Sequence, residues 1–179
     1  MTVVAKVGMR EQHGKVRTAE GIVEVQRSPD GTYEVPAPAD GQPGRVKYDD
    51  EHDVLEIERP GVHLSIQFRG ETEHTVFEFG GRTYEVATMD FGAISIKDAG
   101  RPAVQGHVTV SGVRLLSVAP DLQPIQRELA FGLALRSDAI SKGFWREDEP
   151  FLEGIKERIE TDLLEGDARL HPERGKSDE

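Results

Sequence analysis

A short acidic stretch, YDDEHDV at residues 48–54, holds the densest group of side chains in the sequence that could do chemistry. Hard cations prefer loops rich in carboxylate oxygens, as this one is. The spacing matches no recognised metal-binding loop, and runs of charge are usually solvated. Two interpretations stay open, a metal site and a solvated acidic turn between two strands, and the pattern favours the turn. The candidate metal ligands are Asp49, Asp50, Glu51, His52 and Asp53.

Other side chains that could act in catalysis are scattered along the chain. His63, His74 and His107 fall on predicted strands, where an acid or base would need a partner from another strand. The tripeptide DFG at residues 90–92 matches a kinase motif, but no glycine-rich phosphate loop or catalytic-loop motif accompanies it. The G-x-S-x-G, H-E-x-x-H and Walker patterns are also absent. The sequence therefore favours a non-enzymatic protein without a cofactor, and a metal-dependent enzyme that uses the acidic loop stays as an alternative.

Composition restricts the partners that the protein could have. The formal net charge is -11, and no cluster of Lys and Arg appears, which weighs against nucleic acid or a generally anionic membrane surface as the main partner. The first residues lack the pattern of a signal peptide, and no segment is long enough to span a bilayer. The chain has no cysteine, which is compatible with a reducing compartment. We expect a cytoplasmic protein with no stable membrane insertion.

The region before residue 120 alternates apolar with polar residues and is punctuated by turn signals. In TVFEFGGRTYEV, Gly80 and Gly81 supply a two-residue hairpin turn, which places Phe77 opposite Tyr84. Pro29-Asp30-Gly31 and Pro60-Gly61 mark further hairpins. About ten to twelve such strands are typical of a sandwich or barrel.

After residue 120 the pattern becomes helical. We predict a helix over residues 122–140, with Asp121 as its N-cap and Pro124 near its first turn. The side chains between Leu129 and Leu135 are apolar or Gly and point in every direction around the helix axis, so the helix must be enclosed on all sides. A sheet that curls around the helix would enclose it. A helix pressed between a sheet face and a second helix is the alternative.

A second helix is predicted within residues 146–166, and its pattern is one-sided. Apolar residues recur every fourth position among charged residues, which is typical of an amphipathic helix that lies on a surface. That surface is either the protein's own barrel or a second copy of the chain. Residues 167–179 are polar and contain Gly and Pro, so we expect a disordered tail. The residues of this candidate partner-binding stripe are Phe151, Ile155, Ile159 and Leu163.

The order of these elements resembles the C-terminal half of the Tubby C-terminal-like superfamily, which includes the phospholipid scramblases and the LURP-one-related proteins. The matching residues are Asp98 and Gly100 in a turn, Asp121-Leu122 before the helix, and the apolar helix that ends in Asp138. The resemblance implies an antiparallel barrel, residues 1–145, around a central hydrophobic helix. It also implies a lipid-binding role through basic residues. The candidates for that role are Arg45, Lys47, Arg82, Lys97 and Arg101.

From these features we expect a binding module for a lipid, a small molecule or a protein. An assembly protein that forms a homodimer through its C-terminal helix is the main alternative.

The amphipathic pattern generates the first testable prediction. Replacing Ile155 and Ile159 together by Ser should lower the free energy of unfolding by about 2–5 kcal/mol if the helix packs on its own barrel, because buried aliphatic groups are lost. Urea denaturation measures the free energy of unfolding, and native mass spectrometry measures the number of subunits. A fall from dimer to monomer with the barrel still folded would show instead that the helix joins two subunits.

Overall fold

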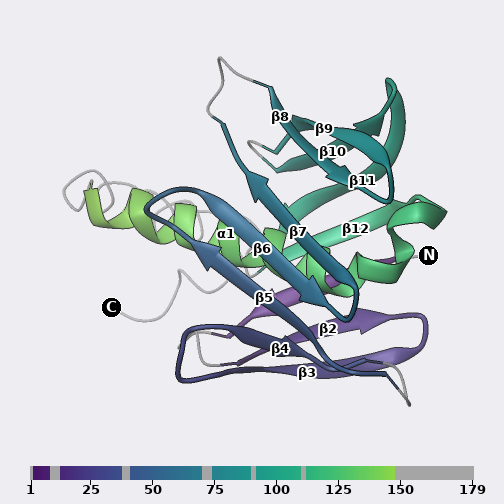
Figure 1. Ribbon diagram of the computed structural model, residues 1–179. Helices are drawn as coiled ribbons and strands as arrows, with labels where there is room; N and C mark the ends of the chain where they lie inside the picture. Colours follow the sequence, from purple (N-terminus) through teal and green to yellow (C-terminus); the bar gives the residue numbers. More distant parts are fainter. Residues whose placement is uncertain are drawn as a thin grey trace, which may run out of the picture. The chain divides into compact units, whose positions relative to one another are not determined.

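The computed structural model describes residues 2–8, 13–37, 41–69, 74–89, 92–109 and 112–147 (Figure 1). The chain divides into two compact units, Met1–Ile140 and Ser141–Glu179. Residues 148–166 of the predicted amphipathic helix and the predicted disordered tail lie outside the described residues.

Within the described residues, twelve β-strands make up most of the first unit, in agreement with the predicted mainly antiparallel β class. Their inward positions are mainly Val, Leu, Ile and aromatic residues, and their outward positions are mainly charged or polar. This alternation is the mark of strands with one buried and one solvated face. The strands are β1 (Val3–Val7), β2 (His13–Thr18), β3 (Gly21–Arg27), β4 (Tyr33–Val35), β5 (Gly44–Asp49), β6 (Val54–Arg59), β7 (Val62–Gln67), β8 (Thr75–Phe79), β9 (Arg82–Thr88), β10 (Ala93–Asp98), β11 (Arg101–Thr109) and β12 (Gly112–Val118).

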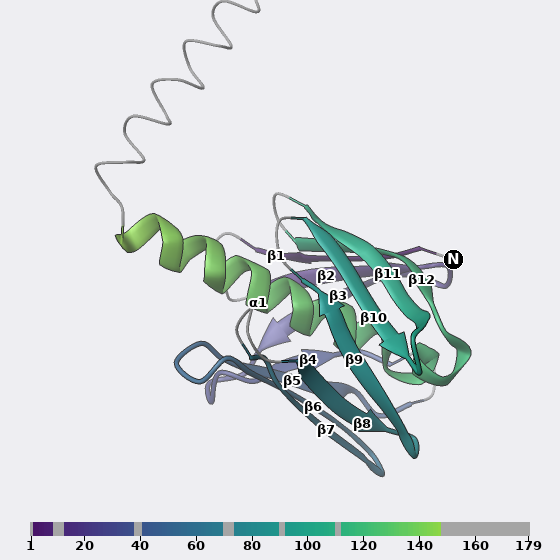
Figure 2. The same ribbon diagram turned by 90° about the horizontal axis from the view of Figure 1, so that it is seen from above.

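All twelve strands belong to one antiparallel sheet. Its order is β7-β6-β5-β4-β3-β2-β1-β12-β11-β10-β9-β8, so the N-terminal strand pairs with the last one. In this order β1 lies between β2 and β12, and Figure 2 shows these three strands in the same part of the sheet. The two end strands, β7 and β8, also contact each other, so the sheet forms a nearly closed barrel. A curved sheet of this kind has an apolar inner face and a polar outer face.

The predicted hairpins are confirmed. Gly80 and Gly81 have φ angles of 57° and 74°, as the turn between β8 and β9 requires. Phe77 lies opposite Tyr84, and their rings stack with centroids 5.2 Å apart in the core. The turns at Pro29-Asp30-Gly31 and Pro60-Gly61 likewise join β3 to β4 and β6 to β7.

The helical region differs from the prediction at both ends. A 3₁₀ helix, Pro120–Ile125, comes first with Ala119 as its N-cap, so the predicted cap at Asp121 is wrong. Pro124 has no N–H to donate, and α1 begins only after it, at Gln126. The helix α1 runs through Gln126–Glu147 rather than ending at residue 140, because a lone Gly in SKGFWRE does not stop a helix. Within the described ranges, no helix is long and apolar enough to cross a membrane.

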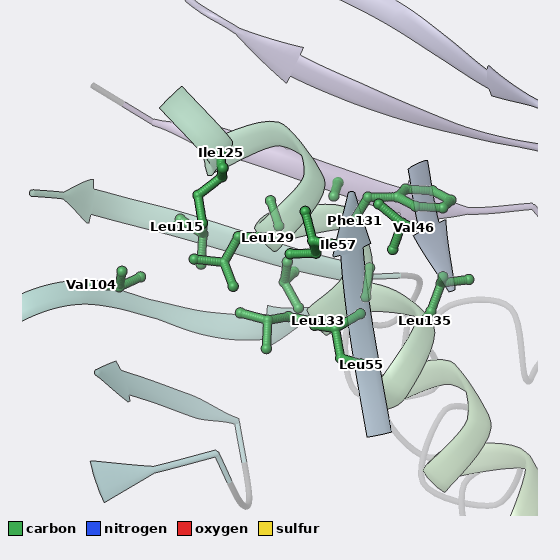
Figure 3. Packing of buried hydrophobic residues seen from close by; sticks show 14 of the residues in the cluster. Val46, Leu55, Ile57, Val104, Leu115, Ile125, Leu129, Phe131, Leu133 and Leu135 are labelled. Atoms are coloured by element: carbon green, nitrogen blue, oxygen red, sulfur yellow. The ribbon is translucent and has the colours of Figure 1, made fainter. Parts of the chain in front are cut away.

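The segment of α1 from Leu129 to Leu135 is buried around its whole circumference. Leu129, Phe131 and Leu133 are completely buried although they leave the helix in different directions. They belong to one hydrophobic core with residues of β5, β6, β11 and β12 (Figure 3). The prediction that this segment is enclosed by other elements agrees with its burial.

Two glycines let α1 approach the strands closely. A Cβ at Gly132 would collide with the side chain of Leu55 on β6. A Cβ at Gly14 on β2 would collide with the ring of Phe131, which also packs against Tyr33 on β4 with ring centroids 5.2 Å apart. The helix and these strands are therefore fitted to each other, as in a close-packed interior.

A buried carboxylate lies at the start of α1. Glu128 has a side chain only 4% exposed, and its Oε1 lies 3.4 Å from Nε of Arg59 on β6. It occupies the space that a side chain at Gly44 would fill. Burial raises the pKa of Glu128, and the nearby charges of Arg59 and Arg127 only partly oppose this shift. Arg127 itself pairs with Glu20 in the β2–β3 turn.

The enclosed segment generates a second prediction. Leu133→Asp should prevent folding, because a charge without a partner in this core costs about 3–5 kcal/mol or more. Ile140→Asp is the matched control, since Ile140 is 49% exposed on the same helix. Circular dichroism and thermal denaturation of both variants test this. A Leu133→Asp variant with an unchanged melting temperature would contradict the burial of α1.

The buried carboxylate generates a third prediction, on pH. Because the pKa of Glu128 is raised in the folded protein, its contribution to stability is complete below the unfolded pKa and is lost as the pH rises through the folded pKa. Glu128→Gln cannot ionise, so its free energy of unfolding relative to wild type should increase as the pH rises above 4.5, the usual pKa of Glu. Urea denaturation of both proteins across this range measures the difference. If the difference in the free energy of unfolding between the two proteins does not change with pH, the pKa of Glu128 is not raised by burial.

Candidate functional site: a cationic groove on the outer face of the sheet

The acidic stretch forms the turn between β5 and β6, and its first carboxylate holds that turn together. Asp49 Oδ1 accepts hydrogen bonds from the backbone N–H of Glu51 at 3.0 Å and of His52 at 3.3 Å. Asp49 Oδ2 lies 2.8 Å from His52 Nδ1. The contact with Asp49 raises the pKa of His52, and the bond from His52 lowers the pKa of Asp49. These groups are exposed, so the pair stabilises the turn only weakly.

The last carboxylate of the stretch binds α1. Asp53, which has a left-handed φ of 53°, accepts two hydrogen bonds from Arg136, at 2.8 and 2.9 Å. It also accepts one from the Tyr48 hydroxyl at 2.6 Å, and burial together with this carboxylate raises the pKa of Tyr48. The Arg136 guanidinium lies over the ring of Phe68, 4.2 Å from its centroid. Asp53 thus contributes to anchoring the helix to the β5–β6 turn.

The metal and acid–base candidates gain no geometric support. Within the residues that the structure describes, no three His, Asp or Glu side chains converge as a metal site would require. His63 is exposed opposite Glu58, and His74 pairs with Glu85 at 2.8 Å on the surface. The metal site at Asp49, Asp50, Glu51, His52 and Asp53 stays a prediction.

The first two of the predicted ligand-binding basic residues lie on β5 among carboxylates. Arg45 pairs with Asp30 at 3.1 Å and lies opposite Glu58 and Glu34. Lys47 lies opposite Glu56. These two cations share a hollow of about 220 Å³ with Asp30, Glu56 and Glu58. The three carboxylates cancel the positive charge there, so the hollow does not favour an anion.

The other three predicted ligand-binding residues lie on neighbouring strands far along the sheet from β5. They are Arg82 on β9, Lys97 on β10 and Arg101 on β11. Arg82 bonds Asp98 at 2.7 Å and lies 3.4 Å from Asp121. Arg101 faces Asp98 across the β10–β11 hairpin, and Lys97 faces Glu85. The structure therefore does not bring the five predicted residues into one site. The partner-binding stripe, Phe151, Ile155, Ile159 and Leu163, lies outside the described residues.

A different group of basic residues does converge, on the outer face of β2, β1, β12 and β11. They line a hollow of about 610 Å³, which we call the cationic groove. This size lies within the range of small-molecule sites, about 300–1,000 Å³. Its lining residues are Val4, Lys6, Lys15, Arg17, Ile22, His107, Thr109 and Arg114.

Strand register explains how the groove forms. Val4 on β1 lies directly opposite Arg17 on β2 and Arg114 on β12, and Arg114 lies opposite His107. Two residues further along β1, Lys6 lies opposite Lys15 on β2 and Gly112 on β12. A Cβ at Gly112 would collide with the backbone of Ala5, so only glycine fits there.

The row that contains Gly112 therefore has no side chain between Lys6 and Thr109. The row of Val4 places Arg17 and Arg114 on its two sides, and the row of Lys6 leaves open space next to Val4.

The charges of the groove are poorly compensated. Among the described residues, Lys15 alone of these cations has an ion-pair partner, Glu24 at 3.2 Å, and both side chains are well exposed. Within the described ranges, Lys6, Arg17 and Arg114 form no ion pair. Like charges directly opposite each other, such as Lys6 and Lys15, destabilise a sheet. In a chain of net charge -11, cations that gather in one hollow without ion-pair partners among the described residues are the feature that most needs a functional explanation.

The groove also has apolar and hydroxyl groups. Val4 is half-buried at its centre, and Ile22, which is 56% exposed, lies opposite Arg17 at one edge. Thr109 lines the other side, and its buried Oγ1 has no hydrogen-bond partner in the part of the chain that the structure describes. A ligand that fits this lining carries negative charge and some apolar surface.

Sequence reasoning missed this site. Lys6, Lys15, Arg17 and Arg114 all occupy outward positions of alternating strands, and that signal was present in the sequence. His107, which the sequence places on a predicted strand, also lines the groove. The pairing of β1 with β12 joins segments more than one hundred residues apart and is what assembles the groove. No family model, curated protein or solved structure matches this chain.

Proposed function

We propose that the protein is a non-enzymatic binding module that takes up a small organic anion in the cationic groove. The observation that carries this proposal is the convergence around Val4 of Lys6, Arg17 and Arg114, which have no ion-pair partner among the residues that the structure describes. Guanidinium groups are well suited to bind carboxylate and phosphate groups through paired hydrogen bonds. A bound anion would also offset the repulsion among these cations.

The proposed module is a barrel that encloses α1, as in the Tubby-like architecture that the sequence resembles. The twelve-stranded, nearly closed sheet and the complete burial of Leu129, Phe131 and Leu133 support this arrangement. An enclosed helix leaves little room for a ligand in the barrel interior, since a Cβ at Gly132 would already collide with Leu55. The outer face is therefore the proposed place for recognition.

The alternative functions have less support. A metal-dependent enzyme would use the acidic turn, whose Asp49 and Asp53 are engaged in hydrogen bonds that hold the turn and α1. Assembly through the C-terminal helix rests on the sequence pattern alone. In the cationic groove, by contrast, Lys6, Arg17 and Arg114 have no ion-pair partner within the described ranges.

The fourth prediction tests anion binding directly. Titration of isotope-labelled protein with octanoate, suberate and phenyl phosphate at low ionic strength should shift backbone amide signals of β1, β2 and β12, with at least one of these anions. Added NaCl should weaken the binding, because exposed charges are screened by salt. Arg17→Gln and Arg114→Gln should each weaken it several-fold.

Lys47→Gln is the matched control, because it removes the same charge from the outer face of β5 and should leave binding unchanged. Circular dichroism shows that each variant is folded. Shifts that centre on β5 or on β9 to β11, or no shifts with any anion, would refute the proposal.

A further inference from the structure

We propose that the ligand of the cationic groove is a dicarboxylate, with one carboxylate bound by Arg17, the other by Arg114, and the methylene chain across Val4. This inference rests on the proposed function and specifies the class of anion. It is carried by the arrangement of two arginines on opposite sides of one apolar residue.

The register gives the spacing of the two arginines. Arg17 on β2 and Arg114 on β12 are both direct cross-strand neighbours of Val4 on β1. Neighbouring strands lie about 4.8 Å apart, so the two arginine backbones are separated by roughly 10 Å across the sheet. Both side chains are exposed on the outer face, as Val4 is in part. An anion with a single small charged group can pair closely with one guanidinium but leaves the other unpaired.

The surface between the two arginines selects the body of the ligand. Val4 offers an apolar floor, and a methylene chain placed over it would be partly removed from water. A hydroxylated or charged spacer would lose its own hydration there without a partner on the valine. The favoured ligand is therefore charged at both ends and apolar between them.

The total charge of the groove agrees with a ligand that carries two negative charges. Three cations, Lys6, Arg17 and Arg114, have no ion-pair partner within the described ranges, and Lys15 is paired only with the exposed Glu24. Lys6 and Lys15 lie one step along the strands from Val4, at the side of the proposed chain. One negative charge would leave most of this positive charge uncompensated.

Calorimetric titration of the full chain with matched acids tests the inference. Suberate and octanoate have the same carbon skeleton and differ in the second carboxylate, while malonate has two carboxylates too close together to reach both arginines. Suberate should bind about tenfold more tightly than either, because a second charge-assisted contact is formed. In Arg17→Gln and in Arg114→Gln, the preference for suberate over octanoate should disappear. In the control Lys47→Gln it should persist.

The outcomes separate this inference from the proposed function. Equal affinity for suberate and octanoate in the wild type, with amide shifts still in the groove, would overturn the dicarboxylate and leave anion binding intact. So would tighter binding of inorganic phosphate or of vesicles of anionic lipid. A lack of binding by every anion would overturn both. A suberate preference that survives in both arginine variants would overturn the assignment of Arg17 and Arg114.

Discussion

The burial of α1 between Leu129 and Leu135 is the constraint on which the rest of the structure depends. A helix with apolar side chains on every side cannot lie on a surface, so the strands must supply apolar residues in many directions. They do so from β5, β6, β11 and β12, which join α1 in one core. Glycines at positions 14 and 132 allow the approach, and polar contacts at Glu128 and Arg136 fix the position of the helix along its axis.

This use of the inner face leaves the outer face free to vary in charge. Several basic residues of the described strands and of α1 form ion pairs with carboxylates, as Arg82 does with Asp98 and Arg136 with Asp53. Lys6, Arg17 and Arg114 of the cationic groove form none within the described ranges, and their strands are central in the sheet order. Because β1, β2, β11 and β12 are paired on both sides, the positions of Lys6, Arg17 and Arg114 are set by rigid backbone rather than by loops. Sites on such elements are positioned more accurately than sites on loops.

Local features of the fold were predictable from the sequence, and long-range ones were not. The Gly80-Gly81 hairpin and the register of Phe77 with Tyr84 follow from turn chemistry over a few residues. The start of α1 was misplaced, because Pro124 lies inside a 3₁₀ turn rather than in the first turn of an α-helix. A short segment that contains proline is compatible both with a 3₁₀ turn and with the first turn of an α-helix.

The sequence alone did not predict which basic residues come together in the candidate site. The basic residues chosen from the resemblance fall on two separated parts of the sheet, where carboxylates face them. The groove instead requires the register between β1 and β12, and alternation within each strand contains no information on that pairing. The acidic stretch is rich in the carboxylates that hard cations prefer, yet Asp53 binds Arg136 and Asp49 accepts hydrogen bonds within the turn.

The central claim is that the cationic groove binds an organic anion, and a crystal structure grown at low salt with bromobenzoate tests it most directly. The bromine marks the position of the anion through its anomalous signal. The account predicts a bromine peak over Val4, with the carboxylate within hydrogen-bond distance of Arg17 or Arg114. A groove without the anion, combined with peaks beside Arg45 and Lys47 or beside Arg82, Lys97 and Arg101, would contradict it.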